Sequence, residues 1–232
     1  MMLATTEVRW FQPGRLPEAV EQWFQQGFQQ GLQQDGSEMA SILPSISESR
    51  EDLYLSMPAL LGLDNLGIKL RQNKLEVKWR TRELEPLCLK DCQGKLEQWL
   101  KWSHGQPVVT QFLTKSFNQT LIQIHKVRTV RRYQLHTDPV LIEIPTNETA
   151  QPGCNVELTK LTVRGDIWWS LGLEASGQDV SHIQHLQTVL EQSMQTYPGI
   201  KLQLQDSYAY PVWLQRLATE EQLQSYSRSR TL

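Results

Sequence analysis

The sequence predicts an α+β protein whose antiparallel sheet is closed or strongly curved, with helices packed outside it. Most segments of the chain have the alternation and composition of β-strands. Three others have the apolar spacing of helices, and the two kinds of segment do not alternate as they do in parallel sheets. No linker rich in Pro, Gly or Ser interrupts the chain, so we expect one domain over residues 1–232.

The N-terminal part of the chain predicts a strand followed by a helix. Residues 3–11 alternate between polar and apolar side chains, which is the period of a strand. A helix is expected to begin at Pro17, because proline is favoured at the first helical position. Its apolar residues Phe24, Phe28 and Leu32 lie four apart, on one face.

The remaining elements follow from the same two periods. Strands are expected at residues 50–55, 66–71, 75–82, 107–117, 119–135, 139–144, 155–164, 166–175 and near 200–205. One helix is expected at 94–102 with Leu96, Trp99 and Leu100 inward, and another from Asp179 to about residue 195. The chain then ends in a short helical segment.

Composition excludes several classes of protein. Hydrophobic residues make up 39% of the chain, the formal net charge is -2, and no apolar run approaches the roughly 18 residues of a spanning helix. A membrane protein and a protein with a basic surface for nucleic acid are therefore not expected, and we predict a cytoplasmic location. The three cysteines, Cys88, Cys92 and Cys154, fit neither a disulfide framework nor a zinc site.

Positive charge is concentrated on a few strand faces. Residues 69–82 contain six Lys/Arg and one Glu, and residues 126–132 contain four Lys/Arg and no acid. Such faces could be the solvated side of an antiparallel sheet. However, like charges side by side on a sheet are destabilising, so we favour an anion that offsets the repulsion. Converging Arg and Lys side chains inside a barrel would form a phosphate or polyphosphate site.

The order of these elements resembles the CYTH superfamily, also called triphosphate tunnel metalloenzymes. Residues 5–11 lie where the family has a Glu-x-Glu-x-Lys strand, and residues 52–55 follow as its Asp-x-Tyr-Tyr strand. Residues 67–71 and 75–80 are similar to its Leu-Arg-x-Arg and Leu-Thr-x-Lys strands. Residues 125–128 are similar to its Lys-x-Arg strand. The resemblance extends over about residues 5–210, to the Ser-Tyr pair at 207–208.

The resemblance implies a closed eight-stranded antiparallel barrel, or tunnel, that holds a triphosphate and Mg²⁺ or Mn²⁺. Family members include thiamine triphosphatases, inorganic triphosphatases and class IV adenylate cyclases, so a phosphohydrolase is implied. Glu7 and Lys78 would be catalytic, and the metal ligands would be Glu7, Glu157 and Glu174. The residues that would bind phosphate are Arg9, Lys69, Arg71, Lys78, Arg80, Lys126 and Arg128.

Several acidic positions of the family pattern carry other residues here. Thr5 stands where the first Glu of the opening motif is expected, and Thr159 stands where members often have Asp. Glu174 is the one acid of an expected Glu-x-Glu pair. Because hard divalent cations need several oxygen ligands, this pattern favours anion binding with weak or absent catalysis, or chemistry with rearranged ligands.

Three functions remain open at this point. The first is a metal-dependent triphosphatase, and the second is a binding module for polyphosphate or a nucleotide on the same fold. The third is a barrel that binds single-stranded nucleic acid, with Trp79 and Trp102 stacking beside the basic strand. We expect Trp79 to lie in the core with Leu75 and Val77 instead, and a small-molecule phosphate to be the partner.

Overall fold

The computed structural model describes residues 2–28, 45–55, 64–72, 74–105, 115, 121–135, 141–147, 153–176 and 181–229. The strands of its main sheet are β1 (Met2–Pro13), β2 (Ile46–Leu55), β3 (Leu66–Arg71), β4 (Lys74–Glu83), β7 (Glu97–His104), β8 (Leu121–Leu135), β9 (Leu141–Ile144), β10 (Gly153–Val163) and β11 (Asp166–Ser176). A separate hairpin consists of β5 (Leu87–Leu89) and β6 (Cys92–Gly94). The helices are α1 (Glu18–Gln26), α3 (Ser181–Thr196) and α4 (Tyr210–Ser229), with a 3-10 turn at Leu204–Asp206.

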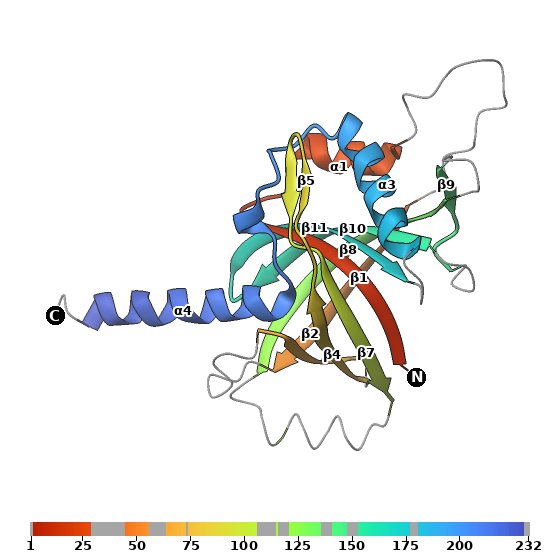
Figure 1. The fold of residues 1–232 in the computed structure, drawn as a ribbon. Helices are drawn as coiled ribbons and strands as arrows, with labels where there is room; N and C mark the ends of the chain where they lie inside the picture. The colour runs from red at the N-terminus through yellow and green to blue at the C-terminus, as the bar shows by residue number, and fades with distance from the viewer. Residues whose placement is uncertain are drawn as a thin grey trace, which may run out of the picture.

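Eight strands form a closed antiparallel barrel (Figure 1). Their order is β10-β11-β1-β7-β4-β3-β2-β8, and β8 also pairs with β10, which closes the ring. Closure depends on the length of β8, whose 15 residues pair with β2 along one edge and with β10 along the other. The strand β9 pairs with residues 132–135 at the end of β8, beyond the part of β8 that pairs with β2. The predicted fold class, a closed eight-stranded antiparallel barrel with helices, is confirmed.

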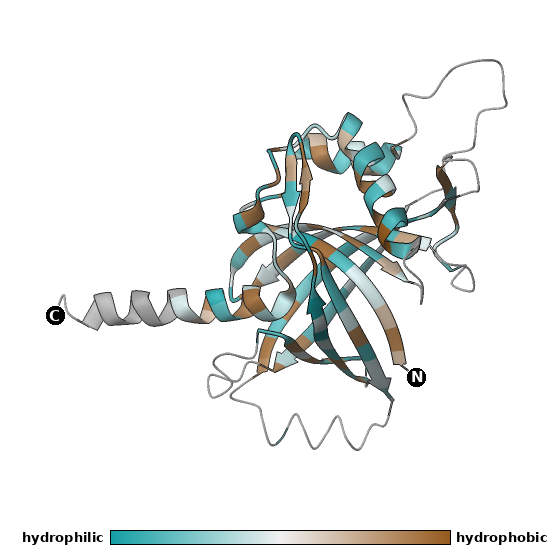
Figure 2. Cartoon of the chain, in the orientation of Figure 1, coloured by the Kyte–Doolittle hydropathy of each residue, from teal (hydrophilic) through white to brown (hydrophobic). Residues whose placement is uncertain are grey.

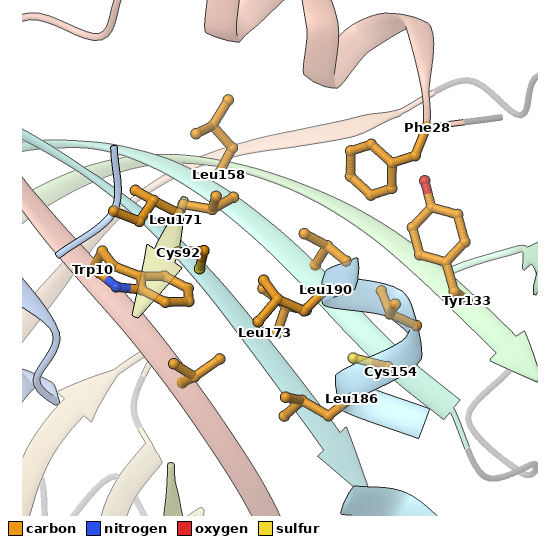
Figure 3. Packing of buried hydrophobic residues seen from close by; sticks show 14 of the residues in the cluster. Trp10, Phe28, Cys92, Tyr133, Cys154, Leu158, Leu171, Leu173, Leu186 and Leu190 are labelled. Atoms are coloured by element: carbon orange, nitrogen blue, oxygen red, sulfur yellow. The ribbon is translucent and has the colours of Figure 1, made fainter. Parts of the chain in front are cut away.

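The outer face of β10, β11 and β1 carries the larger hydrophobic cluster. Side chains alternate between the two faces of a strand, and Figure 2 shows the corresponding alternation of hydrophilic and hydrophobic residues along the barrel. Leu186 and Leu190 of α3 pack on Leu173 and Cys154 of this face (Figure 3). The helices α1 and α3 thus cover one side of the barrel (Figure 1).

Arg131 fastens α1 to the barrel. Its side chain is fully buried on the outer face of β8, where Nε donates a hydrogen bond to the carbonyl of Phe24 at 2.6 Å. The same guanidinium donates to the carbonyl of Gln25 and pairs with Glu143 of β9. A cation at this place satisfies carbonyls that the last turn of the helix leaves without partners and complements the helix dipole.

A second hydrophobic cluster fills one end of the barrel interior. It contains Phe11, Ile124 and Leu161, which lie on the same strand faces as the inward charged residues. Trp213 of α4 is completely buried against them, and its ring stacks on Phe11 with centroids 4.8 Å apart. The first turns of α4 therefore close this end, and the rest of the helix runs away from the barrel (Figure 1).

Three expectations about the elements were wrong. Residues 94–102 are not a helix, because residues 97–104 form β7 between β1 and β4. The segment near 200–205 is a 3-10 turn with one bridge from Leu202 to Cys92. Trp79 is not in the core: it lies half-buried on the outer face of β4. The helix expected from Pro17 ends at Gln26, so Phe28 is not part of it, and the expected continuation to Leu32 lies outside the described residues. The strand expected at 107–117 also lies outside them, apart from residue 115.

The other strands are confirmed, with ends that differ from the expected ones by up to four residues. The helical segment at the end of the chain is not short, because α4 has 20 residues, and the hairpin of β5 and β6 was not predicted. The helix expected from Asp179 is α3, which begins at Ser181. Among the described residues, no helix is both long and apolar enough to cross a membrane.

Candidate anion-binding site

The barrel interior contains a cavity of about 150 Å³ lined mainly by charged side chains. Every strand of the barrel contributes to it, and the segment before and at the start of α4 adds Ala209, Tyr210 and Pro211. Its cationic lining residues are Arg9, Arg50, Lys69, Arg71, Lys78, Lys101, Lys126 and Arg128, and its acidic ones are Glu7, Glu76, Glu97, Glu157 and Glu174. Eight cations against five carboxylates leave three positive charges in excess, or two when the buried Asp52 behind them is included. We call this space the charged cavity.

The period of the strands places these side chains together. Pairs two residues apart, such as Glu7 and Arg9 on β1 or Lys126 and Arg128 on β8, point into the barrel. The closed ring then brings pairs from distant strands to one space. Charges that are 50 to 150 residues apart in the sequence thereby become neighbours, as the ion pair between Arg9 and Glu157 shows.

Glu157 holds two arginines. Arg9 donates to Glu157 Oε1 at 2.9 Å, and Arg128 donates through Nε to Glu157 Oε2. Thr159 donates its hydroxyl to the same Oε1 atom at 2.9 Å. Burial alone would raise the pKa of Glu157, but the charges of Arg128 and Arg9 hold it well below its usual value. The carboxylate is therefore an ionised anchor that orients both guanidinium groups.

Lys78 lies between two facing carboxylates. Glu7 of β1 is directly opposite Glu174 of β11 in the sheet, an arrangement of like charges that is destabilising on its own. The ammonium of Lys78 pairs with Glu7 and lies 3.6 Å from Glu174 Oε2. Burial lowers the pKa of Lys78, whereas Lys78 and Lys101 lower the pKa of Glu174 despite its burial. The positive charge of Lys78 thus offsets the repulsion between the carboxylates of Glu7 and Glu174.

Asp52 is fully buried and gathers three cations. Its carboxylate lies 3.2 Å from Lys126 Nζ, 3.6 Å from Lys69 Nζ and 3.3 Å from Arg50 Nε. Lys126 also donates to the hydroxyl of Tyr54 at 2.7 Å, and its ammonium lies 3.7 Å from the centre of the Tyr210 ring. Burial lowers the pKa of Lys126 to about 7, and burial together with the charge of Lys126 lowers the pKa of Lys69 to about 8.

Glu76 is the third acidic anchor. Its carboxylate forms ion pairs with Arg71 at 2.6 Å and Lys69 at 3.0 Å, and Lys101 of the neighbouring β7 lies 3.7 Å away. Two of these cations come from β3 and one from β7, the strands on either side of β4. Glu76 therefore connects the side chains of both neighbouring strands. The acids of the cavity therefore organise the cations without neutralising all of them.

Nine of the ten residues predicted for the site line the charged cavity, and Arg80 does not. Its guanidinium is held by Glu97 and by Asp64, which it contacts at 3.0 Å. It also lies 6.0 Å from the centre of the Trp99 ring. Arg80 therefore has its own carboxylate partners beside the cavity.

Several residues of the cavity were missed at the level of sequence. Lys101 was overlooked because its segment has the apolar spacing of a helix, although Glu97, Trp99 and Lys101 also alternate as in a strand. Arg50 alternates with Asp52 in the same way. Tyr210 has no local signal, because it reaches the cavity only through the packing of α4 on the barrel.

The predicted metal ligands do not fit a divalent cation. Among the described residues, no group of three or more His, Cys, Asp or Glu side chains could hold a metal ion. Glu7, Glu157 and Glu174 each face an ammonium or guanidinium group instead of an open position. A hard cation needs oxygen ligands that are free of such partners.

Comparison with solved structures shows a distant structural similarity. The S. pombe Pct1 RNA triphosphatase, solved in complex with the Spt5 CTD, aligns with 84% of this chain over 84% of its own, at 10% identity and a TM-score of 0.40. Similarity at this level assigns neither a family nor a function to the chain. No protein-family model and no curated protein matches it.

Proposed function

We propose that this protein binds a triphosphate or a short polyphosphate chain in the charged cavity. The observation that carries the proposal is the excess of cations among its lining residues. Holding unneutralised charges in a partly buried space costs free energy. An anion with several negative charges removes that cost, and arginine and lysine form their strongest hydrogen bonds with such oxyanions.

The size of the cavity favours a compact ligand. Its volume of about 150 Å³ is below the roughly 300–1,000 Å³ of pockets that enclose drug-sized molecules. A bare chain of phosphates fits this space better than a nucleotide whose base and sugar must also be enclosed. The resemblance of residues 5–210 to the CYTH superfamily supports the same class of ligand.

Binding is favoured over hydrolysis. Catalysis by Glu7 and Lys78 stays a prediction, and in the structure these two side chains are paired with each other. A carboxylate held in this way is poorly placed to activate water or to bind a metal ion. Release of phosphate from tripolyphosphate by the purified protein would instead identify a triphosphatase.

The nucleic-acid alternative is not favoured by the geometry of β4 and β7. Trp79 and Trp102 lie on the outer face of the barrel, next to Lys78 and Lys101, which point inward. A stacking platform for single strands needs aromatic rings and cations on the same surface. Here the two tryptophan rings and the two lysines lie on opposite faces of the sheet.

Isothermal titration with sodium tripolyphosphate tests the proposal. We expect saturable binding to the wild-type protein and at least about tenfold weaker binding to Arg128→Gln, since a hydrogen bond to a charged group contributes about 1.5–3 kcal/mol. Glu157 keeps Arg9 as a partner in this variant, so the site keeps its shape.

The matched control is Lys160→Gln. Lys160 lies on β10, the strand that pairs with β8, but its side chain is on the outer face, where it contacts Glu21 at 2.5 Å. This variant loses the same charge from the same barrel and should bind tripolyphosphate as the wild type does. Absence of binding to the wild type, or equal weakening by both variants, would refute a site inside the barrel.

A further inference from the structure

The ammonium of Lys78 occupies the position where a bridging cation between Glu7 and Glu174 would be expected. These two carboxylates face each other across neighbouring strands, and Lys78 of β4 reaches them across the inner face of β7, which lies between β4 and β1. Glu7 also accepts a hydrogen bond from the hydroxyl of Thr5 at 2.8 Å. Glu97 of β7 faces Glu7 from the other neighbouring strand, and its carboxylate is paired with Arg80. The facing acids of the lining thus already have their positive charges.

The remaining acids of the lining leave no other place for a metal ion among the described residues. Both oxygens of Glu157 accept hydrogen bonds, from Arg9 and Thr159 on one oxygen and from Arg128 on the other. Glu76 is surrounded by Lys69, Arg71 and Lys101. A divalent cation at either acid would replace none of these cations and would be repelled by all of them.

We propose that Lys78 takes the place of a divalent metal ion, so that the charged cavity binds its phosphate anion without Mg²⁺ or Mn²⁺. The inference rests on the proposed function, because it concerns how the same cavity neutralises the anion. Its basis is the donor set around the carboxylates, in which every predicted metal ligand is bound by lysine or arginine. The excess of cations in the lining provides the charge that a metal ion would otherwise supply.

The first experiment compares tripolyphosphate binding with and without divalent ions. Wild-type protein is titrated with sodium tripolyphosphate in EDTA and then with millimolar Mg²⁺ in place of EDTA. We expect the dissociation constant in EDTA to be within about threefold of the value with Mg²⁺, a difference of well under 1.4 kcal/mol. Binding that is lost or weakened about tenfold or more by EDTA overturns the inference and leaves the proposed function standing. Failure to bind under both conditions defeats the proposed function itself.

The second experiment measures Mn²⁺ binding directly by electron paramagnetic resonance, without any phosphate. Wild-type protein should leave added Mn²⁺ free in solution, because Lys78 occupies the space between Glu7 and Glu174. The variant Lys78→Ala should gain a Mn²⁺ site, and the gain should disappear in Lys78→Ala combined with Glu174→Gln. Mn²⁺ bound by the wild-type protein, or no gain in a folded Lys78→Ala protein, contradicts the inference.

Lys101→Ala serves as the matched control for the variant. Lys101 is the cross-strand partner of Lys78 and also lines the charged cavity, but its ion pair is with Glu76. Removing it takes away the same charge while leaving Lys78 between Glu7 and Glu174. We expect no Mn²⁺ site in this variant, and a gain equal to that of Lys78→Ala would show that only the overall charge matters. The wild-type measurement decides the inference even where a variant does not fold.

Discussion

Lys126 is the most deeply buried cation of the charged cavity, with only 3% of its side chain exposed. Its ammonium group faces Asp52 and Tyr54 of β2 and the ring of Tyr210. The charges of Glu157 and Arg50 also influence its pKa. Burial lowers its pKa to about 7, although the two carboxylates oppose this effect. A lysine in the unfolded chain keeps its proton up to a pH of about 10.4. Between these values the unfolded state binds more protons, so the protein without ligand becomes more stable as pH rises.

The same titration predicts weaker anion binding at higher pH. Lys126 and Lys69, with pKa values of about 7 and about 8, lose their charges as pH rises through that range. We expect the affinity for tripolyphosphate to fall about tenfold or more between about pH 7 and about pH 9, as one or two charge-assisted hydrogen bonds are lost. Titration calorimetry in buffers of different ionisation heats should show proton uptake on binding.

The variant Lys126→Arg separates this effect from titration of the ligand. Arginine keeps its charge throughout the range, so the variant should have a flatter pH profile than the wild type. Any further ionisation of tripolyphosphate as pH rises only adds negative charge, so the ligand itself should not weaken binding. An affinity that stays constant or rises between about pH 7 and about pH 9, or an equal slope in both proteins, would contradict the assigned role of Lys126.

At the scale of the strands, one glycine allows a salt bridge to pass across a neighbouring strand. Arg9 of β1 and Glu157 of β10 are both cross-strand partners of Gly172 on the intervening β11. A Cβ atom on Gly172 would lie 2.6–2.9 Å from the guanidinium of Arg9. The missing side chain therefore leaves the gap through which Arg9 reaches Glu157.

Gly172→Ala should weaken anion binding without removing any charge. The atoms that the new methyl group meets belong to the end of a flexible side chain, so we expect Arg9 to move and the barrel to remain folded. Loss of the orientation of Arg9 should raise the dissociation constant for tripolyphosphate about tenfold, the effect of one charge-assisted hydrogen bond. Calorimetric titration and a thermal melt of the same samples measure both properties.

Gly105→Ala provides the comparison, since a Cβ atom there would meet nothing closer than the Lys74 side chain at 3.5 Å. The Gly105→Ala variant should change neither the affinity for tripolyphosphate nor the melting temperature. Unaltered tripolyphosphate binding by Gly172→Ala would mean that Arg9 does not contact the anion, whereas loss of the folded state would mean that the strand itself cannot adapt.

The elements that sequence predicts well are those whose pattern is local. The faces of β4 and β8 could be predicted because Lys78 alternates with Val77, and Lys126 with Val127, within single strands. In β7 the spacing of Leu96, Trp99 and Leu100 fits a helix equally well, and only pairing with β1 and β4 selects the strand. Local periodicity cannot resolve that ambiguity.

At the scale of the whole molecule, the barrel concentrates positive charge in its interior, which the net charge of the whole chain does not reveal. The formal net charge is -2, yet the lining of the charged cavity carries three positive charges in excess, so all other residues together carry an excess of five negative charges. Sequence indicated the basic faces, but closure of the ring depends on the pairing of β8 with β10. Likewise, the pairing of Glu157 with Arg9 could not be predicted, because it depends on a register between strands almost 150 residues apart.

The excess charge in the cavity predicts that the protein is more stable without one of its cations. Lys101 and Lys78 are directly opposite each other on β7 and β4, and like charges in such positions destabilise a sheet. In Lys101→Met, Glu76 keeps Arg71 at 2.6 Å and Lys69 at 3.0 Å. The free energy of unfolding without ligand should therefore rise by about 0.2–1 kcal/mol. Since about 1 kcal/mol shifts the melting temperature of a protein of this size by roughly 2–4 °C, calorimetric melts can detect the gain.

Addition of tripolyphosphate should reverse the order of stability. A ligand stabilises the folded state according to its concentration relative to the dissociation constant, and the variant should bind the anion more weakly than the wild type. The wild-type melting temperature should then rise further with added ligand and pass that of Lys101→Met. Lys201→Met, which removes an exposed lysine 3.9 Å from Asp91, should follow the wild type at every concentration. A Lys101→Met protein that is less stable than the wild type without ligand would show that Lys101 serves to hold Glu76, because repulsion from Lys78 would then be the smaller effect.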